Sequence, residues 1–338
     1  MSATKEVMQE LMSQAIVQAQ LATLTQDVNP QVGAILVNEK NEVVATGFHR
    51  GSGTAHAEVD VLSKVADTTG LTLYTTMEPC NAVGKQGPCS QAIVAAGIKK
   101  VVIGQPDLNP TMLGGAHYLT EHGVEVTSGV LSDECARINE SWNFAITNNR
   151  PWVIWKIATS LDGYIAAADG TSKWITDQPA RSAVQDLRAT VGAIVTGTGT
   201  ALADDPELTV RNVELANQPV RVVLGNRQLP KTAKLLLGDN PAMQISQDVS
   251  TALTQLWTKF GVHKVLVEAG PGLSKSLWQA GLVDEVYWFQ APLILGSGIH
   301  AIGDFGISTL DAGRRFSDYA VNRVGLDLLI HFRTNQGN

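Results

Sequence analysis

The sequence T-A-H-A-E at residues 54–58 is followed by T-M-E-P-C at 76–80 and by G-P-C at 87–89. This stretch supplies one imidazole, from His56, and two thiols, from Cys80 and Cys89. Such a set can bind a zinc ion and leave its fourth coordination position open, as catalytic zinc sites do. Glu58 stands two residues after the histidine, where its carboxylate can exchange protons with a zinc-activated water. The stretch therefore predicts a catalytic zinc site served by Glu58.

The spacing of these residues leaves other interpretations open. Zinc nucleobase deaminases carry H-x-E followed by P-C-x-x-C, but here the two cysteines lie nine positions apart. The pattern could be coincidental, because lone cysteines are most often small buried hydrophobic residues. The zinc could also be structural, if Cys135 or His49 supplied a fourth protein ligand. Cys135 lies in a predicted helix, and we expect it in the core.

Length, composition and charge indicate a globular protein of two domains. The chain has 338 residues, 44% hydrophobic and 17% charged, which is enough apolar material for two cores. Its formal net charge of −7 argues against a general nucleic-acid binder, because neutralising phosphates requires a basic face. With two of the three cysteines assigned to metal, no disulfide framework remains, which favours a reducing cytoplasm.

Targeting and membrane signals are missing from the sequence. The first ten residues have neither the basic nor the apolar region of a signal peptide. No apolar run reaches the ~20 residues that span a bilayer. We therefore expect a cytoplasmic protein that acts on a small molecule, without a nucleic-acid or membrane partner. A homo-oligomer is compatible with the sequence, which does not fix the oligomeric state.

Hydrophobic periodicity predicts alternating helices and strands in a first domain spanning residues 1–147. Helices are expected at 5–23, 55–66, 90–96 and 131–148, and strands at 32–37, 43–47, 71–76 and 101–104. This order predicts a sheet with helices on both faces and a metal site at the N-termini of two helices. The positive end of the helix after Cys89 should favour that residue as a thiolate.

A second domain, over residues 151–335, follows a linker at 148–151. Strands are expected at 152–158, 193–196, 220–224 and 264–267, with a helix around 183–187. After the last strand, E-A-G-P-G-L-S-K-S at 268–276 opens a helix. Small residues there let backbone N–H groups approach an anion. The string is not G-x-G-x-x-G, so by itself it is equally compatible with an ordinary turn.

Several rare strings occur in one order and resemble RibD, the bifunctional deaminase/reductase family of riboflavin biosynthesis. In the first domain they are V-N-P-Q-V-G-A-I-L-V at 28–37, G-F-H-R-G-S-G-T-A-H-A-E-V at 47–59, and Q-P-D-L-N-P-T-M-L-G-G-A at 105–116. In the second they are S-L-D-G at 160–163, S-K-W-I-T at 172–176, A-D-D-P-E-L-T-V-R at 203–211, and E-A-G-P-G at 268–272. The wider cysteine spacing is the family's own, and the resemblance covers residues 5 to 332.

The resemblance implies two folds and two reactions. The first domain is expected to be a cytidine-deaminase-like αβα domain with one zinc ion. It would hydrolyse the 2-amino group of 2,5-diamino-6-ribosylamino-4(3H)-pyrimidinone 5′-phosphate. The second is expected to be an α/β domain similar to dihydrofolate reductase. It would transfer a hydride from NADPH to C1 of the ring-opened ribose, giving a ribityl chain.

The resemblance also implies site residues. In the first domain, His56, Cys80 and Cys89 match the zinc ligands, Glu58 the proton shuttle, and Asn29 a residue that holds the pyrimidine edge. The implied NADPH contacts are Ala158, Trp174, Thr200, Asp204, Gly270, Pro271, Gly272, Leu273, Ser274, Lys275 and Ser276. The implied reductase substrate contacts are Ser172, Arg188, Leu208, Arg211 and Glu268. Among these, the two arginines suit the ribose phosphate, because a guanidinium binds phosphate in a bidentate manner.

One loop departs from the family. Where the family carries S-H-H-G-R-T, residues 81–86 read N-A-V-G-K-Q. Lys85 is the only cation left in the loop, and we expect it to contact the substrate phosphate. Three alternatives remain open: an inert or substrate-binding second domain, a nucleic-acid editing deaminase, and a binding module with structural zinc. The acidic charge argues against the editing deaminase.

Overall fold

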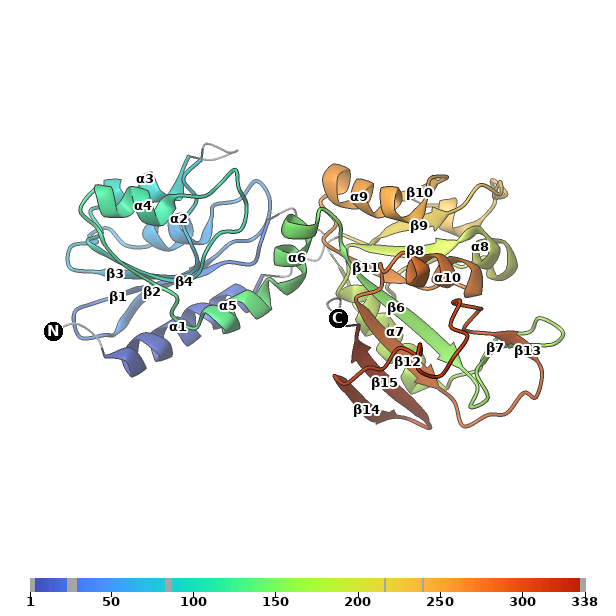
Figure 1. The fold of residues 1–338 in the computed structure, drawn as a ribbon. Coiled ribbons are helices and arrows are strands. Elements are labelled where there is room, and N and C mark those ends of the chain that lie inside the picture. The colour runs from blue at the N-terminus through green and yellow to red at the C-terminus, as the bar shows by residue number, and fades with distance from the viewer. Residues whose placement is uncertain (1–3, 23–28, 83–86, 216, 239, 335–338) are drawn as a thin grey trace. The chain divides into compact units, whose positions relative to one another are not determined.

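The computed structural model describes residues 4–22, 29–82, 87–215, 217–238 and 240–334. The chain forms two compact units, Met1–Thr147 and Asn148–Asn338, which are described separately (Figure 1). Among the helices of the described residues, none has both the length and the apolar character needed to cross a bilayer.

The first unit is built on a five-stranded sheet of order β2-β1-β3-β4-β5. Strand β1 is antiparallel to β2 and β3, whereas β3, β4 and β5 run parallel. Helices α1 and α5 cover one face, and α2, α3 and α4 cover the other, as expected (Figure 1). The bounds are α1 Lys5–Gln20, β1 Gly33–Val37, β2 Val43–Phe48, α2 Ala57–Leu62, β3 Thr72–Met77, α3 Cys89–Ala95, β4 Lys100–Gln105, α4 Gly115–Glu121, β5 Glu125–Ser128, α5 Ser132–Ile138 and α6 Glu140–Asn148.

The core under α1 explains how the sheet is held. Leu11 and Met12 of α1 pack with Ile35 and Tyr74 of the central strands, all of them buried. Cys135 of α5 completes this cluster, so its expected place in the core is confirmed. Burial of such apolar side chains is the main favourable contribution to folding.

The single helix expected over 131–148 is wrong, because the structure has two helices that meet at Asn139. The Asn139 amide accepts a hydrogen bond from the backbone N–H of Gln31 at 2.7 Å and donates one to its carbonyl at 2.8 Å. This contact with the segment before β1 fixes Asn139 where the helix breaks. The helix expected at 55–66 is also shorter, since α2 covers Ala57–Leu62.

The second unit is built on an eight-stranded sheet of order β10-β9-β8-β11-β6-β12-β15-β14. The neighbouring strands β10, β9, β8, β11, β6 and β12 run parallel to one another. Strand β15 is antiparallel to both β12 and β14. Strands β7 and β13 form a separate pair. The bounds are β6 Trp152–Thr159, β7 Tyr164–Ala167, α7 Gln178–Ala189, β8 Ala193–Gly197, α8 Thr198–Asp204, β9 Val220–Leu224, η1 Lys234–Leu236, β10 Ala242–Ile245, α9 Val249–Phe260, β11 Lys264–Val267, α10 Pro271–Gln279, β12 Glu285–Gln290, β13 Gly298–His300, β14 Tyr319–Val324 and β15 Asp327–Arg333.

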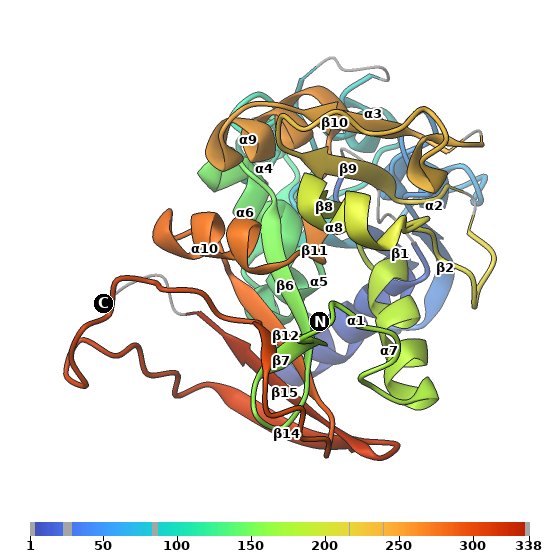
Figure 2. The ribbon, with the colours of Figure 1, turned by 90° about the vertical axis from the view of Figure 1, so that its right-hand side faces the viewer.

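Successive side chains of each strand point to opposite faces of the sheet, and both faces are buried under helices. Val153 and Trp155 of β6 pack with side chains of α9 and α10, whereas Ile154 packs with Leu187 of α7. Helix α8 contributes Ala201 to a smaller cluster with Val223 of β9. Figure 2 shows α10 and α7 on opposite sides of the strands. The carboxyl ends of β9, β8, β11 and β6 therefore form one continuous edge, the usual place for ligands in parallel sheets.

Candidate active sites

The three side chains that we expect to bind zinc in the first unit come from three segments. His56 is the N-cap of α2, Cys80 follows β3, and Cys89 is the first residue of α3. His56 Nδ1 lies 3.6 Å from Cys80 Sγ and 3.2 Å from Cys89 Sγ, and the three donor atoms lie within 4.8 Å of one another. Nitrogen and sulfur ligands of a tetrahedral zinc are about 3.6 Å apart, as its bond lengths require. The donors therefore fit zinc as they stand.

The two residues considered as a fourth ligand are engaged elsewhere. Burial raises the pKa of Cys135 to about 12, and a Cβ on Gly104 would lie 2.4 Å from its sulfur. His49 Nδ1 lies 3.0 Å from the Ala55 carbonyl oxygen, and its Nε2 lies 3.1 Å from Asn29 Nδ2. Within the described residues, the three donors form the one His/Cys/Asp/Glu cluster with metal-binding geometry. This arrangement favours an open catalytic site over a closed structural one.

The first N–H of α3 is directed at Cys80 rather than at Cys89, whose thiolate we expected it to stabilise. The Cys89 backbone N–H, at the start of α3, donates to Cys80 Sγ at 3.4 Å. A hydrogen bond from the Cys89 thiol, together with His56, lowers the pKa of Cys80 to about 4. The same bond and burial raise the pKa of Cys89. The N-terminus of α3 therefore stabilises the thiolate of Cys80, because its first N–H points at that sulfur rather than at its own.

Glu58 is 3% exposed in the first turn of α2 and lines the same cavity as His56 and Cys80. Burial, and then the negative charge of Cys80, raises the pKa of Glu58 to about 7. A carboxyl group with a pKa near the working pH can both accept and donate a proton. Glu58 lies beside the three donor atoms but is not itself one of the expected metal ligands, a position that suits proton transfer.

The cavity of the first unit measures about 330 Å³ and contains more polar groups than the sequence analysis assigned. Asn29 lines it, and so do His49, Asp107 and Asn109. The Ala55 carbonyl can only accept, so the neutral His49 ring carries its proton on Nδ1 and accepts from the Asn29 amide at Nε2. Burial raises the pKa of Asp107 to about 6. His49 lies in the string G-F-H-R, and Asp107 and Asn109 lie in Q-P-D-L-N-P. Both strings supported the family resemblance, but the spacing of these three residues did not predict a role for them in the site.

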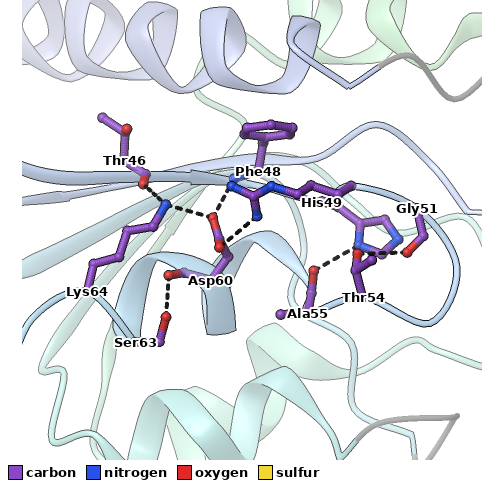
Figure 3. Close-up of polar contacts among 10 residues, drawn as sticks. Thr46, Phe48, His49, Gly51, Thr54, Ala55, Asp60, Ser63 and Lys64 are labelled. Carbon is purple, nitrogen blue, oxygen red and sulfur yellow. Dashed lines mark hydrogen bonds and ion pairs between the residues drawn. The ribbon is translucent and has the colours of Figure 1, made fainter.

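Asp60 fixes α2 to strand β2 next to this cavity (Figure 3). Its carboxylate pairs with Arg50 Nη1 at 2.8 Å and with Lys64 Nζ at 2.9 Å. It also accepts the backbone N–H of Phe48 at 3.2 Å. The network therefore ties α2 to the end of β2 and to the start of the loop that carries His49.

The segment over 105–116 packs against the loop that carries Cys80. Glu78 Oε1 accepts the backbone N–H of Ala116 at 2.9 Å, and Asn81 N–H donates to the Met112 carbonyl at 3.0 Å. A Cβ on Gly115 would lie 1.7 Å from the Pro79 carbonyl oxygen. A glycine is therefore required for the two backbones to approach this closely.

A cavity of about 670 Å³ lies in the second unit, where β8, β9 and β11 end. Its size is within the range of small-molecule sites. The expected residues that line it are Ser172, Thr200, Asp204, Gly270, Pro271, Gly272, Leu273 and Ser276. Gly270 N–H donates to Thr200 Oγ1 at 3.1 Å, and a Cβ on Gly272 would meet nothing within 4 Å. Because the turn before α10 has open space in front of it, a nucleotide cofactor fits.

Other expected cofactor residues lie away from this cavity. Trp174 is 69% exposed, with the Arg181 guanidinium 4.7 Å from its ring centroid. Ala158 packs with Phe289 in a cluster beside α7. Ser274 is buried and donates to the Gly270 carbonyl at 3.2 Å. Neither Ser274 nor Lys275 lines the cavity.

The expected substrate residues divide into a buried group and an exposed one. Arg188 donates to both Glu268 oxygens, at 2.6 and 3.1 Å, so this face of its guanidinium is engaged. Lys156 Nζ lies 3.8 Å from the Glu268 carboxylate. The sequence analysis did not predict this residue for the site, although a lysine inside the apolar strand W-V-I-W-K-I-A-T is unusual enough to indicate a functional role. Arg211 is exposed and pairs with Glu207 at 3.4 Å. Leu208 is buried in the core beside α7.

Comparison with known proteins agrees with both halves of this description. Residues 5–105 match the cytidine and deoxycytidylate deaminase zinc-binding region, and residues 151–330 match the RibD C-terminal domain. The chain is 36% identical to the riboflavin biosynthesis protein RibD of Aquifex aeolicus, over 90% of this chain and 92% of that protein. The chain belongs to the RibD family.

Two solved RibD structures extend this likeness to the whole fold. RibD of Acinetobacter baumannii has 35% identity and a TM-score of 0.89, covering 98% of this chain and 100% of that one. A Thermotoga maritima protein described as a diaminohydroxyphosphoribosylaminopyrimidine deaminase/5-amino-6-(5-phosphoribosylamino)uracil reductase has 31% identity and a TM-score of 0.85. It is covered over 99% of its length, and this chain over 97%.

Membership of the RibD family confirms several expectations. The fold class is a cytidine-deaminase-like domain joined to a RibD reductase domain. The chain is a bifunctional deaminase and reductase of riboflavin biosynthesis that acts on a small-molecule pyrimidine, with Zn²⁺ and NADPH as cofactors. Lys85, which we expected to contact the substrate phosphate, lies outside the described residues.

Proposed function

We propose that this chain deaminates 2,5-diamino-6-ribosylamino-4(3H)-pyrimidinone 5′-phosphate in its first unit and reduces the ribosyl product in its second. One observation carries the proposal: His56, Cys80 and Cys89 converge beside buried Glu58 in one cavity, while a separate cavity of nucleotide size lies in the other unit. Water is needed for one step and a hydride donor for the other, so separate sites suit the chemistry.

In the first step, His56, Cys80 and Cys89 hold zinc, which when bound makes water nucleophilic near neutral pH. Glu58 accepts a proton from the attacking water and returns it to the departing ammonia. Asn29 donates to His49 through its amide nitrogen, which orients the amide at the cavity wall. We propose that this amide binds the pyrimidine edge. The C–N bond breaks, a C=O bond forms, and ammonia leaves.

In the second step, NADPH when bound would supply a hydride to C1 of the ring-opened ribose and leave as NADP⁺, while a proton from solvent would complete the reduction of the C1 double bond. The start of α10 offers the backbone N–H groups of Gly272 and Leu273 to the cofactor's pyrophosphate, because Pro271 has no N–H and the Gly270 N–H donates to Thr200. Asp204 lines the same cavity. Arg188 and Lys156 hold Glu268 ionised, and we propose that Glu268 accepts from ribose hydroxyls. Arg211 is exposed, and we assign it to the ribose phosphate.

We further propose a cytoplasmic enzyme with no nucleic-acid or membrane partner. The net charge of −7 supports this, since phosphate backbones and anionic lipids both attract basic surfaces.

The test is incubation of the full chain with the diaminopyrimidinone phosphate, with and without NADPH. We expect ammonia release in both cases and loss of NADPH absorbance only when substrate is present. Ammonia without NADPH oxidation would leave the second unit as an inert or substrate-binding domain. The absence of both ammonia release and NADPH oxidation, in folded and zinc-loaded protein, would overturn the proposal.

A further inference from the structure

Asp327 is a buried carboxylate to which neither proposed reaction gives a role. It is the first residue of β15 and is 2% exposed. Its Oδ2 accepts the backbone N–H of Asp177 at 2.8 Å, across 150 positions of sequence. Burial, and also the negative charge of Asp177, raises the pKa of Asp327. Because burial and a like charge both disfavour the ionised form, this position is unfavourable for an acid. Its presence there therefore needs a role that packing does not supply.

A second hydrogen bond joins Asp177 to the turn between β14 and β15. The Asp177 carboxylate accepts the Leu326 N–H at 2.7 Å, while it also caps α7. Gly325 has φ +63°, and a Cβ there would lie 2.8 Å from Pro179 Cγ and closer still to Asp177 Oδ2. A glycine is therefore required for this approach. We call the contact of Asp177 with residues 325–327 the hairpin clasp.

The hairpin clasp lies at the C-terminal end of the loop S-K-W-I-T, residues 172–176. At the other end of this loop, Ser172 lines the second unit's cavity, and its hydroxyl donates to Asp204 of α8 at 3.4 Å. Next to the clasp, Arg181 of α7 donates to the Thr176 carbonyl at 2.7 Å. The loop is therefore tied to the cavity at one end and to the β14–β15 turn at the other.

We propose that Asp327 is a positioning residue of the reductase, which holds the loop 172–176 so that Ser172 stays at the cavity. A loop released at one end samples more conformations, so only a fraction of the molecules is ready to bind, and the apparent affinity falls by that fraction. Saturating substrate restores the loop, so the effect falls on KM rather than on kcat. The inference rests on the proposed function, because it takes Ser172 to contact the reductase substrate.

The test supplies the full chain with the deaminated intermediate and NADPH, and compares Asp327→Ala with Asp327→Asn. Asp327→Ala removes the acceptor and should raise the KM for the intermediate by about tenfold, since hydrogen bonds to charged groups are among the stronger ones. The kcat should stay within about twofold, because bound substrate orders the loop. Asp327→Asn keeps an acceptor oxygen for the Asp177 N–H, so its KM should stay within about threefold of wild type.

Gly325→Ala disturbs the hairpin clasp without removing an acid, because its added methyl would push against Asp177. It should raise KM in the same way, and it decides alone if Asp327→Ala does not fold. Asp318→Ala is the matched control, because it removes an exposed acid just before β14 and should leave both constants unchanged.

Three outcomes would overturn the positioning role of Asp327. The first is a fall in kcat at unchanged KM in the clasp variants, which would mean that Asp327 only stabilises the fold. The second is unchanged kinetics in those variants, and the third is an equal rise in KM for Asp327→Ala and Asp327→Asn. Wild-type protein that does not reduce the intermediate would instead overturn the proposed function.

Discussion

The guanidinium of Arg188 and the carboxylate of Glu268 form a two-point ion pair, with Nε–Oε1 at 2.6 Å and Nη2–Oε2 at 3.1 Å. The residues are 80 positions apart in the sequence, and both side chains are largely buried. Burial acts to raise the pKa of Glu268, but the charges of Arg188 and Lys156 outweigh it and hold the pKa at about 2. This pair therefore couples the ionisation of a proposed substrate residue to the stability of the second unit.

Replacing Glu268 by Gln should destabilise the second unit. The substitution leaves Arg188 buried without its counter-ion, which typically costs about 3–5 kcal/mol. Six of the seven tryptophans lie in residues 148–338, so urea unfolding followed by tryptophan fluorescence reports mainly on this unit. Glu207→Gln is the control, because it breaks the exposed pair with Arg211 and should cost at most about 1 kcal/mol. Equal losses in both variants would contradict the buried-pair argument.

Acid should weaken the second unit through the same carboxylate. The folded-state pKa of Glu268, about 2, lies below its ordinary value of 4.5, so its contribution is complete above about pH 5. It is lost as the pH falls from there toward 2, and amounts to about 3 kcal/mol. Unfolding free energies of wild type and Glu268→Gln should therefore converge over this interval. A difference that stays constant from pH 6 to about pH 3 would show that the pKa is not depressed.

The two activities should separate by mutation. Glu58→Gln should keep its zinc, measured by metal analysis, and lose ammonia release by about 10²-fold or more, since it removes the proton carrier. The same variant should still oxidise NADPH when deaminated intermediate is supplied. Arg211→Ala should show the reverse pattern, with impaired reduction and near-normal deamination. If both activities fell together in both folded variants, the model of two separate sites would be wrong.

Gly115→Ala should weaken zinc binding without touching a zinc ligand. The added methyl would lie 1.7 Å from the Pro79 carbonyl, so the loop that carries Cys80 must move. Displacing a supporting contact of this kind typically costs about 10- to 100-fold in metal affinity. Gly87→Ala is the matched control, because it lies between two zinc ligands in sequence but its added methyl would meet nothing within 4 Å. Competition with a chelator gives both affinities, and similar values for the two variants would count against the packing argument.

Gly272→Glu should weaken NADPH and NADH alike. The side chain would enter the open space before α10 and bring negative charge to the proposed pyrophosphate site. We expect the Kd of each cofactor to rise by about tenfold or more, on the order of 1.4 kcal/mol. Gly272→Ala adds no charge and should change either Kd by less than about threefold. Unchanged cofactor binding by the Glu variant would place the cofactor elsewhere.

Local patterns in the sequence were enough to predict many of the elements. Strands β9 and β11 have the expected bounds, because each is a short apolar run enclosed by polar or turn residues. The prediction of a single helix over 131–148 was wrong for a reason that lies outside that segment of the sequence. Asn139 is held by Gln31, 108 positions away, and no periodicity within the helix carries that information.

The sequence by itself determined the zinc ligand types, the neighbouring carboxylate and the membership of the RibD family, because these depend on residue identity and short spacing. Only the tertiary structure decided that Arg188 pairs with Glu268, that Trp174 is exposed, and that Ser172 and Gly272 line one cavity. A charged or aromatic side chain has many partners of similar energy along the chain. The strand order of the sheet selects among them, since it sets which distant residues come within hydrogen-bonding distance.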